Sequence, residues 1–422
     1  MKKLFYFTLL VLIISCDPSI GEKRIIAEYE PQEMIFIGLR TDSSYYSEDE
    51  KLNTLIAWDS LNLDIAKLCQ EFVKVNLIVS DSTVFQNAEA RLLAYGLDTS
   101  RVKIFYQNPT KGFYRDPTPL FGMDEKGSLF AVDFNWTSYD NINHPDSIRE
   151  KAIKEERIDA DLADKLGIPT IKLDLAFEGG AFENNGQGAV ILTEVLMKGR
   201  NPDKSLQDIE KELKEKLNIK QVIWLPKGAA EDPQKWHVYK RGFIGLGTGG
   251  HTDEYVRFAN DTTILLAWVE EYEKNRHFID SMNYANYNEC YNILSNTSRP
   301  DGRKYTIIKV PSAPVLEDVQ IADTTNGWTQ KELEWAGVSQ GDTIIQIAAS
   351  SYLNYVITNN LLIIPSYSEQ TKGSESIKKD REVFEIFREI FPNHEIRQMN
   401  PSLFNWRGGG LHCRYKELPA VD

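Results

Sequence analysis

Cysteine is scarce in this sequence, and closely spaced pairs of cysteine or histidine are missing. Four cysteines occur among 422 residues, and neither a CxxC nor an HxxxH pair is present. Because such pairs supply the ligands of most structural zinc sites, the sequence predicts no metal site.

Clusters of basic residues are missing as well. The chain has 48 lysines and arginines against 62 acidic residues, for a formal net charge of -14. A surface that binds nucleic acid needs clustered lysine and arginine to neutralise phosphates, so we exclude a nucleic-acid partner. The excess of acidic residues favours a small cationic substrate.

A long apolar run stands at the N-terminus, where it is typical of an export signal. Two lysines precede an apolar stretch from Leu4 to Ile14, and Ser15 and Cys16 follow it. Such a stretch is too short to span a bilayer as a mature helix and has the layout of a cleaved signal peptide. Its end, LIISC, resembles the signal of bacterial lipoproteins, in which the cysteine is lipidated. An ordinary signal peptide with an unrelated cysteine is the alternative.

These features predict three segments. Residues 1–15 form a lipoprotein signal peptide, residues 16–24 form the lipidated Cys16 and a polar tether, and residues 25–422 form one domain. The predicted location is therefore extracytoplasmic, in the periplasm or at the cell surface of a bacterium, with the lipid as the only membrane contact. The sequence does not decide which membrane leaflet holds the lipid.

Without Cys16, three cysteines remain. An odd number means that at least one thiol is unpaired. Cys69 and Cys290 lie in helical patterns and read as small buried residues, although a disulfide between them stays open. Cys413 differs because it ends the segment RGGGLHC close to the C-terminus, where most chains are poorly ordered.

The rest of the chain predicts an α/β fold. Short apolar runs such as residues 74–80, 188–194 and 360–366 alternate with polar segments of helical period, of which 205–218 and 381–392 are the clearest. The segment GLGTGG at 245–250 matches a GxGxxG pattern. A strand-like run and not a helix follows it, which excludes a dinucleotide fingerprint.

Glycines recur beside polar residues in three segments. They are FEGG with Glu178, GGHTDE with His251 and Asp253, and GGGLHC with Cys413. Glycine lets a chain approach a ligand closely, so we expect these three loops to converge on one site.

A thiol, an imidazole and several carboxylates suit one kind of chemistry. A thiolate attacks, and a nearby cation lowers the thiol pKa enough to form it. In this interpretation His251 transfers protons and Glu178 orients the imidazole. Two further carboxylates, Asp116 in FYRDPTPLF and Asp253, suit a planar cation with several N–H donors, which is a guanidinium.

Six blocks of the sequence resemble, in order, the agmatine deiminase and bacterial-type peptidylarginine deiminase family. The blocks are FYRDPTP, FEGGAFENNGQGAVILTEVLMKGRNP, QVIWLPKG, GGHTDEYVRF, ASSYLNYVITNNLLIIPSY and GGGLHC. The resemblance begins at Ala27 and covers nearly all of the chain after the tether. It implies a five-bladed α/β propeller of pseudo-fivefold ββαβ units, a deiminase domain over 25–422, and no cofactor.

The resemblance also implies roles for single residues. Cys413 would be the nucleophile, His251 the general acid and base, Glu178 its orienting partner, and Asp116 with Asp253 the guanidinium clamp. Asn354, in SYLNY, matches another active-site position, and His412 would only position its neighbour. The implied reaction is hydrolysis of a guanidino group through a covalent thiouronium on the cysteine. Agmatine would give N-carbamoylputrescine, and arginine or peptidyl-arginine would give citrulline, each with ammonia.

Departures from the family pattern bear on the substrate. Thr118 replaces a glycine in the family's RDxGP turn, and Trp406 and Arg407 are additional residues at the expected pocket rim. Glu254 stands where agmatine-type members often have asparagine. Together with export, Glu254 favours arginine, free or in an arginine-containing peptide, but agmatine stays open.

Two other functions stay open at this stage. A non-catalytic lipoprotein that binds a guanidino or amine ligand would use the same anchor and acidic balance. An amidinotransferase would use every catalytic residue and pass the amidino group to an amine instead of water. A homodimer is an open alternative to a monomer.

Overall fold

The computed structural model describes residues 23–39, 60–80, 89–90, 92–139, 147–240, 242–326 and 330–421. The predicted signal peptide, Cys16 and most of the tether lie outside these residues. No helix within the described residues is long and apolar enough to cross a membrane.

Five sheets share one arrangement of strands. In each, two antiparallel strands are followed by a third that runs parallel to the second. The five are β5(Leu120–Met123), β6(Leu129–Asp133) and β7(Thr170–Lys172); β8(Glu183–Asn184), β9(Ala189–Thr193) and β10(Gln221–Leu225); β13(Val256–Phe258), β14(Thr263–Trp268) and β15(Thr306–Pro311); β18(Val356–Thr358), β19(Leu361–Pro365) and β20(Glu395–Met399); β21(Tyr415–Pro419), β2(Gln32–Gly38) and β3(Lys74–Val79). Two outer strands extend the first and the last of these sheets, β1(Arg24–Ile25) and β4(Val102–Tyr106).

Helices connect the second strand of each sheet to the third. They are α3(Ser147–Glu155) and α4(Ile158–Leu166), α5(Glu194–Arg200) and α6(Leu206–Leu217), α7(Phe278–Asn296), α9(Ser368–Thr371) and α10(Ser374–Ile390), and the helical residues 60–69. The order ββαβ therefore recurs five times, and the predicted α/β class is confirmed. Among the described residues the strands form six separate sheets and no closed barrel.

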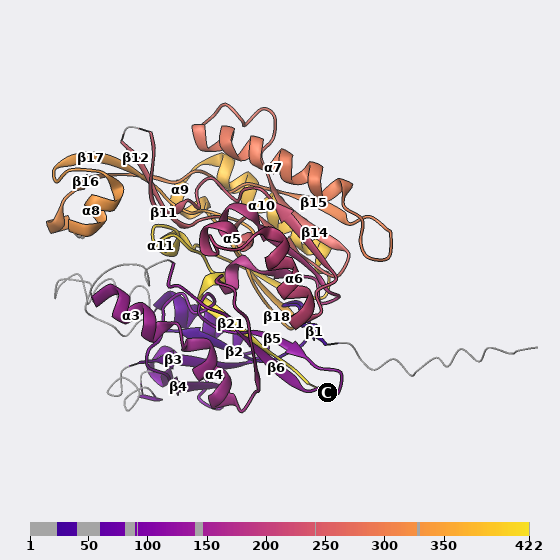
Figure 1. Ribbon diagram of the computed structural model, residues 1–422. Coiled ribbons are helices and arrows are strands. Elements are labelled where there is room, and N and C mark those ends of the chain that lie inside the picture. The colour runs from indigo at the N-terminus through magenta and orange to yellow at the C-terminus, as the bar shows by residue number, and fades with distance from the viewer. Residues whose placement is uncertain are drawn as a thin grey trace, which may run out of the picture.

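The last strand of the chain pairs with the first long one. β21 lies antiparallel to β2, with Tyr415 opposite Ile37 and Glu417 opposite Ile35. The two ends of the chain thus complete one sheet in the lower half of Figure 1. Because this pairing fixes Tyr415 in the core, it also holds Cys413, two residues earlier, inside the molecule.

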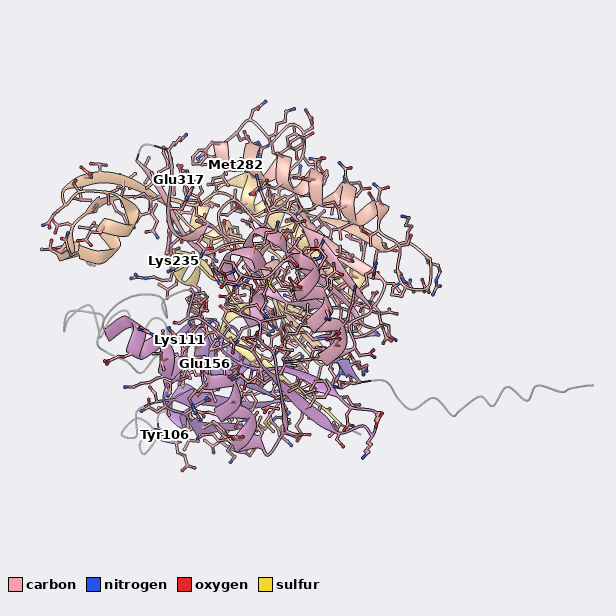
Figure 2. All side chains as sticks on the ribbon, viewed as in Figure 1. Tyr106, Lys111, Glu156, Lys235, Met282 and Glu317 are labelled. Carbon is pink, nitrogen blue, oxygen red and sulfur yellow. The ribbon has the colours of Figure 1, made fainter. Side chains whose placement is uncertain are left out.

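A sixth sheet stands outside the five repeats. It is built from β11(Gln234–Lys240), β12(Phe243–Thr248), β17(Asp342–Ile347) and β16(Glu317–Ala322), and α8(Gln330–Ala336) connects the last two in sequence. Figure 1 shows β16, β17 and α8 projecting from the upper left of the molecule, and Figure 2 places Lys235 of β11 above Lys111 on the same side. The segment GLGTGG lies in β12 and the turn after it, where no dinucleotide-binding helix begins.

Local signals explain the predicted helices. Ser205 and Asp208 form a capping box at the start of α6, Ile209, Leu213 and Leu217 are buried, and Asn218 ends the helix in a left-handed conformation with φ of 56°. A polar helix with one buried stripe packs on a sheet in this way.

All three cysteines in the described residues are free and buried. Burial raises the pKa of Cys290 to about 12 and that of Cys69 further. The disulfide left open for these two residues is therefore not formed.

The packing of α6 gives a test of the fold. Leu213 is fully buried in a core cluster that also holds Leu192 and Leu196. Leu213→Ala should lower the free energy of unfolding by about 2–5 kcal/mol, measured by urea titration. The matched control Lys211→Ala, on the exposed face of the same helix, should change it by less than about 0.5 kcal/mol. Equal effects of the two substitutions would contradict this packing.

Candidate active site

The structure brings all six predicted site residues together in its interior. Each lies in a loop or short turn next to a strand, and each is at most 2% exposed. The six are Asp116 before β5, Glu178 before the 3-10 turn Gly179–Ala181, His251 before the 3-10 turn Thr252–Glu254, Asp253 within that turn, Asn354 before β18, and Cys413 in the 3-10 turn His412–Arg414.

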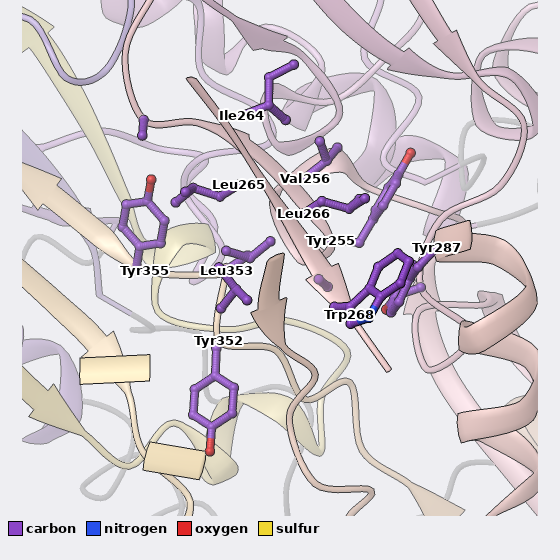
Figure 3. Close-up of a cluster of buried hydrophobic side chains, with 14 of the residues drawn as sticks. Tyr255, Val256, Ile264, Leu265, Leu266, Trp268, Tyr287, Tyr352, Leu353 and Tyr355 are labelled. Atoms are coloured by element: carbon purple, nitrogen blue, oxygen red, sulfur yellow. The ribbon is translucent and has the colours of Figure 1, made fainter. Parts of the chain in front are cut away.

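Two of the loops rest on the same core cluster. Figure 3 shows Tyr255 and Val256, which follow Asp253, packed in one cluster with Leu353, which precedes Asn354. Residues far apart in the sequence are thereby fixed relative to each other.

Gly180 shows how tightly the loops converge. A Cβ atom at this position would lie 2.7 Å from Nδ1 of His251, 2.9 Å from Oδ1 of Asp116 and 3.0 Å from Oδ2 of Asp253. At the third glycine segment, a Cβ on Gly410 would lie 2.3 Å from Oδ1 of Asn354. The predicted convergence of the glycine loops is confirmed, and close approach explains these two glycines.

His251 lies among carboxylates. Nδ1 is 3.7 Å from Oδ1 of Asp116 and 3.9 Å from Oδ1 of Asp253, and Nε2 is 3.6 Å from Oε2 of Glu178. These distances are just beyond hydrogen-bond length. Burial disfavours the imidazolium, but the carboxylates, Asp116 foremost, outweigh it and raise the pKa of His251 to about 10. The ring is therefore charged at neutral pH.

Glu178 is held from behind by Arg200. The Nε of Arg200 donates to Oε1 of Glu178 at 2.6 Å, and both side chains are fully buried. Burial opposes ionisation, yet the guanidinium keeps the pKa of Glu178 below its usual value. Arg200 was not identified from the sequence, although it lies in the block MKGRNP.

Asp116 accepts two hydrogen bonds and keeps one side toward the site. The backbone N–H of Gly180 donates to Oδ1 at 3.0 Å, and the Tyr139 hydroxyl donates to Oδ2 at 2.5 Å. Burial, reinforced by the nearby Asp253, raises the pKa of Asp116. A cation that entered the site would favour the ionised form of the Asp116 carboxyl.

Cys413 faces Asn354 and Asp253. Its Sγ is 3.4 Å from Nδ2 of Asn354 and 3.7 Å from Oδ2 of Asp253. Burial, with Asp253 and Glu254 adding to it, raises the pKa of the thiol well above its usual value. The empty site thus holds a protonated thiol. Asp253 reaches toward Cys413 with one oxygen and toward His251 with the other, so the sulfur and the imidazole flank the same carboxylate.

His412 does more than position Cys413, which corrects the expectation from the sequence. Its Nδ1 lies 2.7 Å from Oδ2 of Asp253, and its Nε2 lies 2.8 Å from Oε2 of Glu28. Glu28 was not identified from the sequence because nothing in AEYEPQEM marks one of its acids as buried.

Asp232 shapes the loop that carries His251. Its Oδ2 accepts the backbone N–H of Gly250 at 2.9 Å and of His251 at 2.8 Å. Gly250 has a φ of 107°, a conformation that other residues rarely adopt. Strands β11 and β12 of the sixth sheet lie between Asp232 and this loop in the sequence. The contact could therefore not be identified from the sequence.

Glu254 adds a third acid near the sulfur. It is 4% exposed, and its Oε1 accepts a hydrogen bond from Nδ2 of Asn354 at 2.8 Å. Burial, followed by Asp253, raises its pKa well above the usual value. Ligand atoms of Asp253, Glu254 and Cys413 lie within 4.8 Å of one another. This group could face a cation, either a metal ion or a planar organic group.

Thr118, at the substituted position of the RDxGP turn, makes hydrogen bonds inside that turn. The Thr118 hydroxyl donates within its own turn, to the carbonyl oxygens of Tyr114 and Arg115 at 2.9 Å each. Trp406 is half-buried and Arg407 is exposed.

Comparisons with known proteins place the chain in one family. A family model described as Porphyromonas-type peptidyl-arginine deiminase matches residues 24–419. An agmatine deiminase of Pseudomonas aeruginosa is 26% identical over 370 residues, which cover 84% of this chain and 86% of the relative. An agmatine deiminase of Stutzerimonas stutzeri is 28% identical over 346 residues, which cover 80% of this chain and 83% of the relative.

A solved structure has the same fold. The agmatine deiminase of Enterococcus faecalis superposes with a TM-score of 0.71 at 22% identity, over 94% of this chain and 96% of the other. This likeness supports the fold, and the chemistry has to be argued from the side chains described above.

The charge on His251 predicts how stability depends on pH. Its pKa is about 10 in the folded protein against 6.5 for an ordinary histidine, so folding favours the protonated ring. This contribution is complete below about pH 6.5 and is lost as the pH rises toward 10. The free energy of unfolding of the wild type minus that of His251→Gln should fall by roughly 1–4 kcal/mol across this range.

Urea titrations from pH 6 to pH 10 would measure this difference. The control His237→Gln removes an exposed histidine of β11, and the fall should be larger for His251→Gln than for this control. A constant difference for His251→Gln would contradict the charged imidazole.

Proposed function

The chain belongs to the Porphyromonas-type peptidyl-arginine deiminase family, and we propose that it deiminates a guanidino substrate through a covalent intermediate on Cys413. As a member of this family it is a hydrolase of C–N bonds in linear amidines. The observation that carries the proposal is Asp253, which lies 3.7 Å from the sulfur of Cys413 and 3.9 Å from the imidazole of His251.

The two aspartates form the cation site. Asp116 and Asp253 both border Gly180, where an added methyl group would contact a carboxylate oxygen of each. A guanidinium that donates to both carboxylates would offset their burial and present its central carbon to Cys413. Asn354, 3.4 Å from the sulfur, fixes the nucleophile on one side.

The substrate itself activates the thiol. Burial and the surrounding acids keep Cys413 protonated. The positive charge of an arriving guanidinium compensates Asp116 and Asp253 and lowers the thiol pKa. The thiol proton then passes to water, because His251 already carries its own proton. His251 is already an imidazolium at neutral pH, so it suits the role of acid toward the leaving amine.

The reaction then has two halves. The thiolate adds to the guanidino carbon, the C–N bond to one amino group breaks, and His251 gives its proton so that ammonia leaves. His251 is now a base and takes a proton from water, whose oxygen attacks the thiouronium carbon. The C–S bond breaks, Cys413 is restored, and a ureido product remains. Glu178, held by Arg200, keeps the imidazole oriented through both halves.

The substrate class is a compound that ends in a guanidinium. The relatives from Pseudomonas and Stutzerimonas are agmatine deiminases, which favours agmatine. The buried acid Glu254 and the predicted export favour arginine, free or at the end of a peptide. A binding protein without turnover has no use for a thiol and an imidazole on one carboxylate, and an amidinotransferase would need an amine acceptor in place of water.

The remaining expectations belong to the same proposal. The five ββαβ repeats, closed by the pairing of β21 with β2, support an arrangement as five blades around the site. Export and lipidation at Cys16 rest on the N-terminal sequence and place the enzyme outside the cytoplasm. Neither a homodimer nor a monomer is favoured by any contact described above.

Product analysis tests the proposal. The domain from residue 23 onward, incubated with agmatine, arginine and arginine-terminated peptides, should release ammonia and form the matching ureido compound from at least one of them. Cys413→Ala should lower turnover by at least about a thousandfold because the covalent path is lost. Cys290→Ala, at a buried thiol of α7, should leave turnover within about threefold of the wild type. Full turnover by Cys413→Ala, or ammonia from none of the compounds, would disprove it.

A further inference from the structure

A cluster of buried charge lies directly behind the proposed cation site. Its centre is Glu28, whose carboxylate contacts Nε2 of His412 at 2.8 Å and Nη2 of Arg257 at 2.6 Å and also pairs with Nη1 of Arg115. Arg115, Arg257 and His412 are each at most 1% exposed. None of the four residues has a role in the reaction described above.

His412 joins this cluster to Asp253. One ring nitrogen lies 2.7 Å from Asp253 and the other lies 2.8 Å from Glu28. Carboxylate oxygens only accept hydrogen bonds, so an imidazolium ring, which donates from both nitrogens, is the form that satisfies both contacts. Its charge, through hydrogen bond and Coulomb attraction, outweighs burial and keeps the pKa of Asp253 below its usual value.

The cluster also fixes the backbone of three other site residues. Arg115 precedes Asp116, and its Nε donates to the carbonyl oxygen of His412 at 3.2 Å. The Nη1 of Arg257 donates to the carbonyl oxygen of Leu353, which precedes Asn354, at 3.2 Å. His412 itself precedes Cys413. Arg115, Leu353 and His412 therefore each stand one residue before a residue of the proposed site.

We propose that Glu28 and His412 act as a positioning pair that keeps Asp253 ionised and aimed at the substrate guanidinium. This inference rests on the proposed function, because it assigns Asp253 a cationic partner. Neither residue touches the reacting atoms. Glu28 holds the proton on Nε2 of His412, and Nδ1 of His412 holds the carboxylate of Asp253 in its place.

Other charges act on the two carboxylates as well, and the test has to allow for them. Asp253 is also influenced by His251 and Arg257, while the neighbouring acids Asp116 and Glu254 and the thiol Cys413 lie on its other sides. Glu28 is stabilised by Arg115 first, then by His412 and Arg257, which hold its pKa well below the usual value. Removing His412 thus takes away the hydrogen-bonded cation of Asp253 and leaves Glu28 with two arginines.

Kinetics as a function of pH test the pair. In His412→Gln and in Glu28→Gln, the substrate KM should rise with a smaller change in kcat. The acid limb of kcat/KM should move up by about one pH unit or more, so that kcat/KM falls about tenfold at pH values below the wild-type limb. The kcat/KM of the double variant should be little lower than that of the less active single variant, because both residues act through one contact.

Glu30→Gln is the matched control. Glu30 lies two residues after Glu28 and pairs with Arg24 at 2.6 Å, away from the site. This variant should keep the wild-type KM and pH profile. An unchanged acid limb in both test variants, or losses that add fully in the double variant, would overturn the proposal.

A second measurement does not depend on turnover or on the variants. The ¹⁵N NMR spectrum of the histidine-labelled wild-type protein at pH 7 should show both ring nitrogens of His412 protonated. Its signal is assigned by its loss in His412→Gln or, if that variant does not fold, by elimination against the other histidines. A neutral His412 ring would overturn the pair even if the enzyme is active. Absence of wild-type turnover with a doubly protonated ring would contradict the proposed reaction and leave the pair standing.

Discussion

Buried negative charge is the constraint on which this structure depends. Asp116, Glu178, Asp253 and Glu254 lie in one interior region and are each at most 4% exposed. Isolated carboxylates are costly to bury, so each either has a cation behind it or carries a raised pKa. Arg200 stands behind Glu178 and His412 behind Asp253, whereas the pKa values of Asp116 and Glu254 are raised. In the proposed function a guanidinium supplies one more positive charge to this region, together with directed N–H donors.

The fold meets this constraint by placing charged residues next to the groups that face the substrate. The sheet completed by β21 and β2 brings Glu28, near the start of the chain, against His412, near its end. A segment that would fray in most proteins is thereby enclosed on all sides. The same cluster reaches the loops of Asp116 and Asn354 through Arg115 and Arg257. The carboxyls of the proposed site are therefore backed by a second set of buried residues, the cations Arg115, Arg257 and His412.

The sequence was informative where a short segment carries its own signal. The capping box at Ser205 and the buried stripe of α6 could be predicted because helix period and caps are local. The glycine-rich segments marked the loops that meet at Gly180 and Gly410, because loops that approach each other closely are rich in glycine. Glu28, Arg200 and Asp232 could not be identified in this way. Their partners lie far away in the chain or across an inserted sheet, and an acidic or basic residue that will be buried resembles one that will be exposed. The sixth sheet escaped prediction for a related reason, since its strands pair across segments that are distant in sequence.

Rapid acid quench followed by mass spectrometry tests the central claim most directly. The wild-type enzyme is mixed with a guanidino compound that it hydrolyses and is quenched within the first turnover. The peptide that contains Cys413 should then be heavier by the mass of the substrate minus the mass of ammonia. The adduct should be absent from the peptides of Cys69 and Cys290. Steady release of ureido product without any adduct on Cys413, at quench times that sample the whole first turnover, would contradict the account.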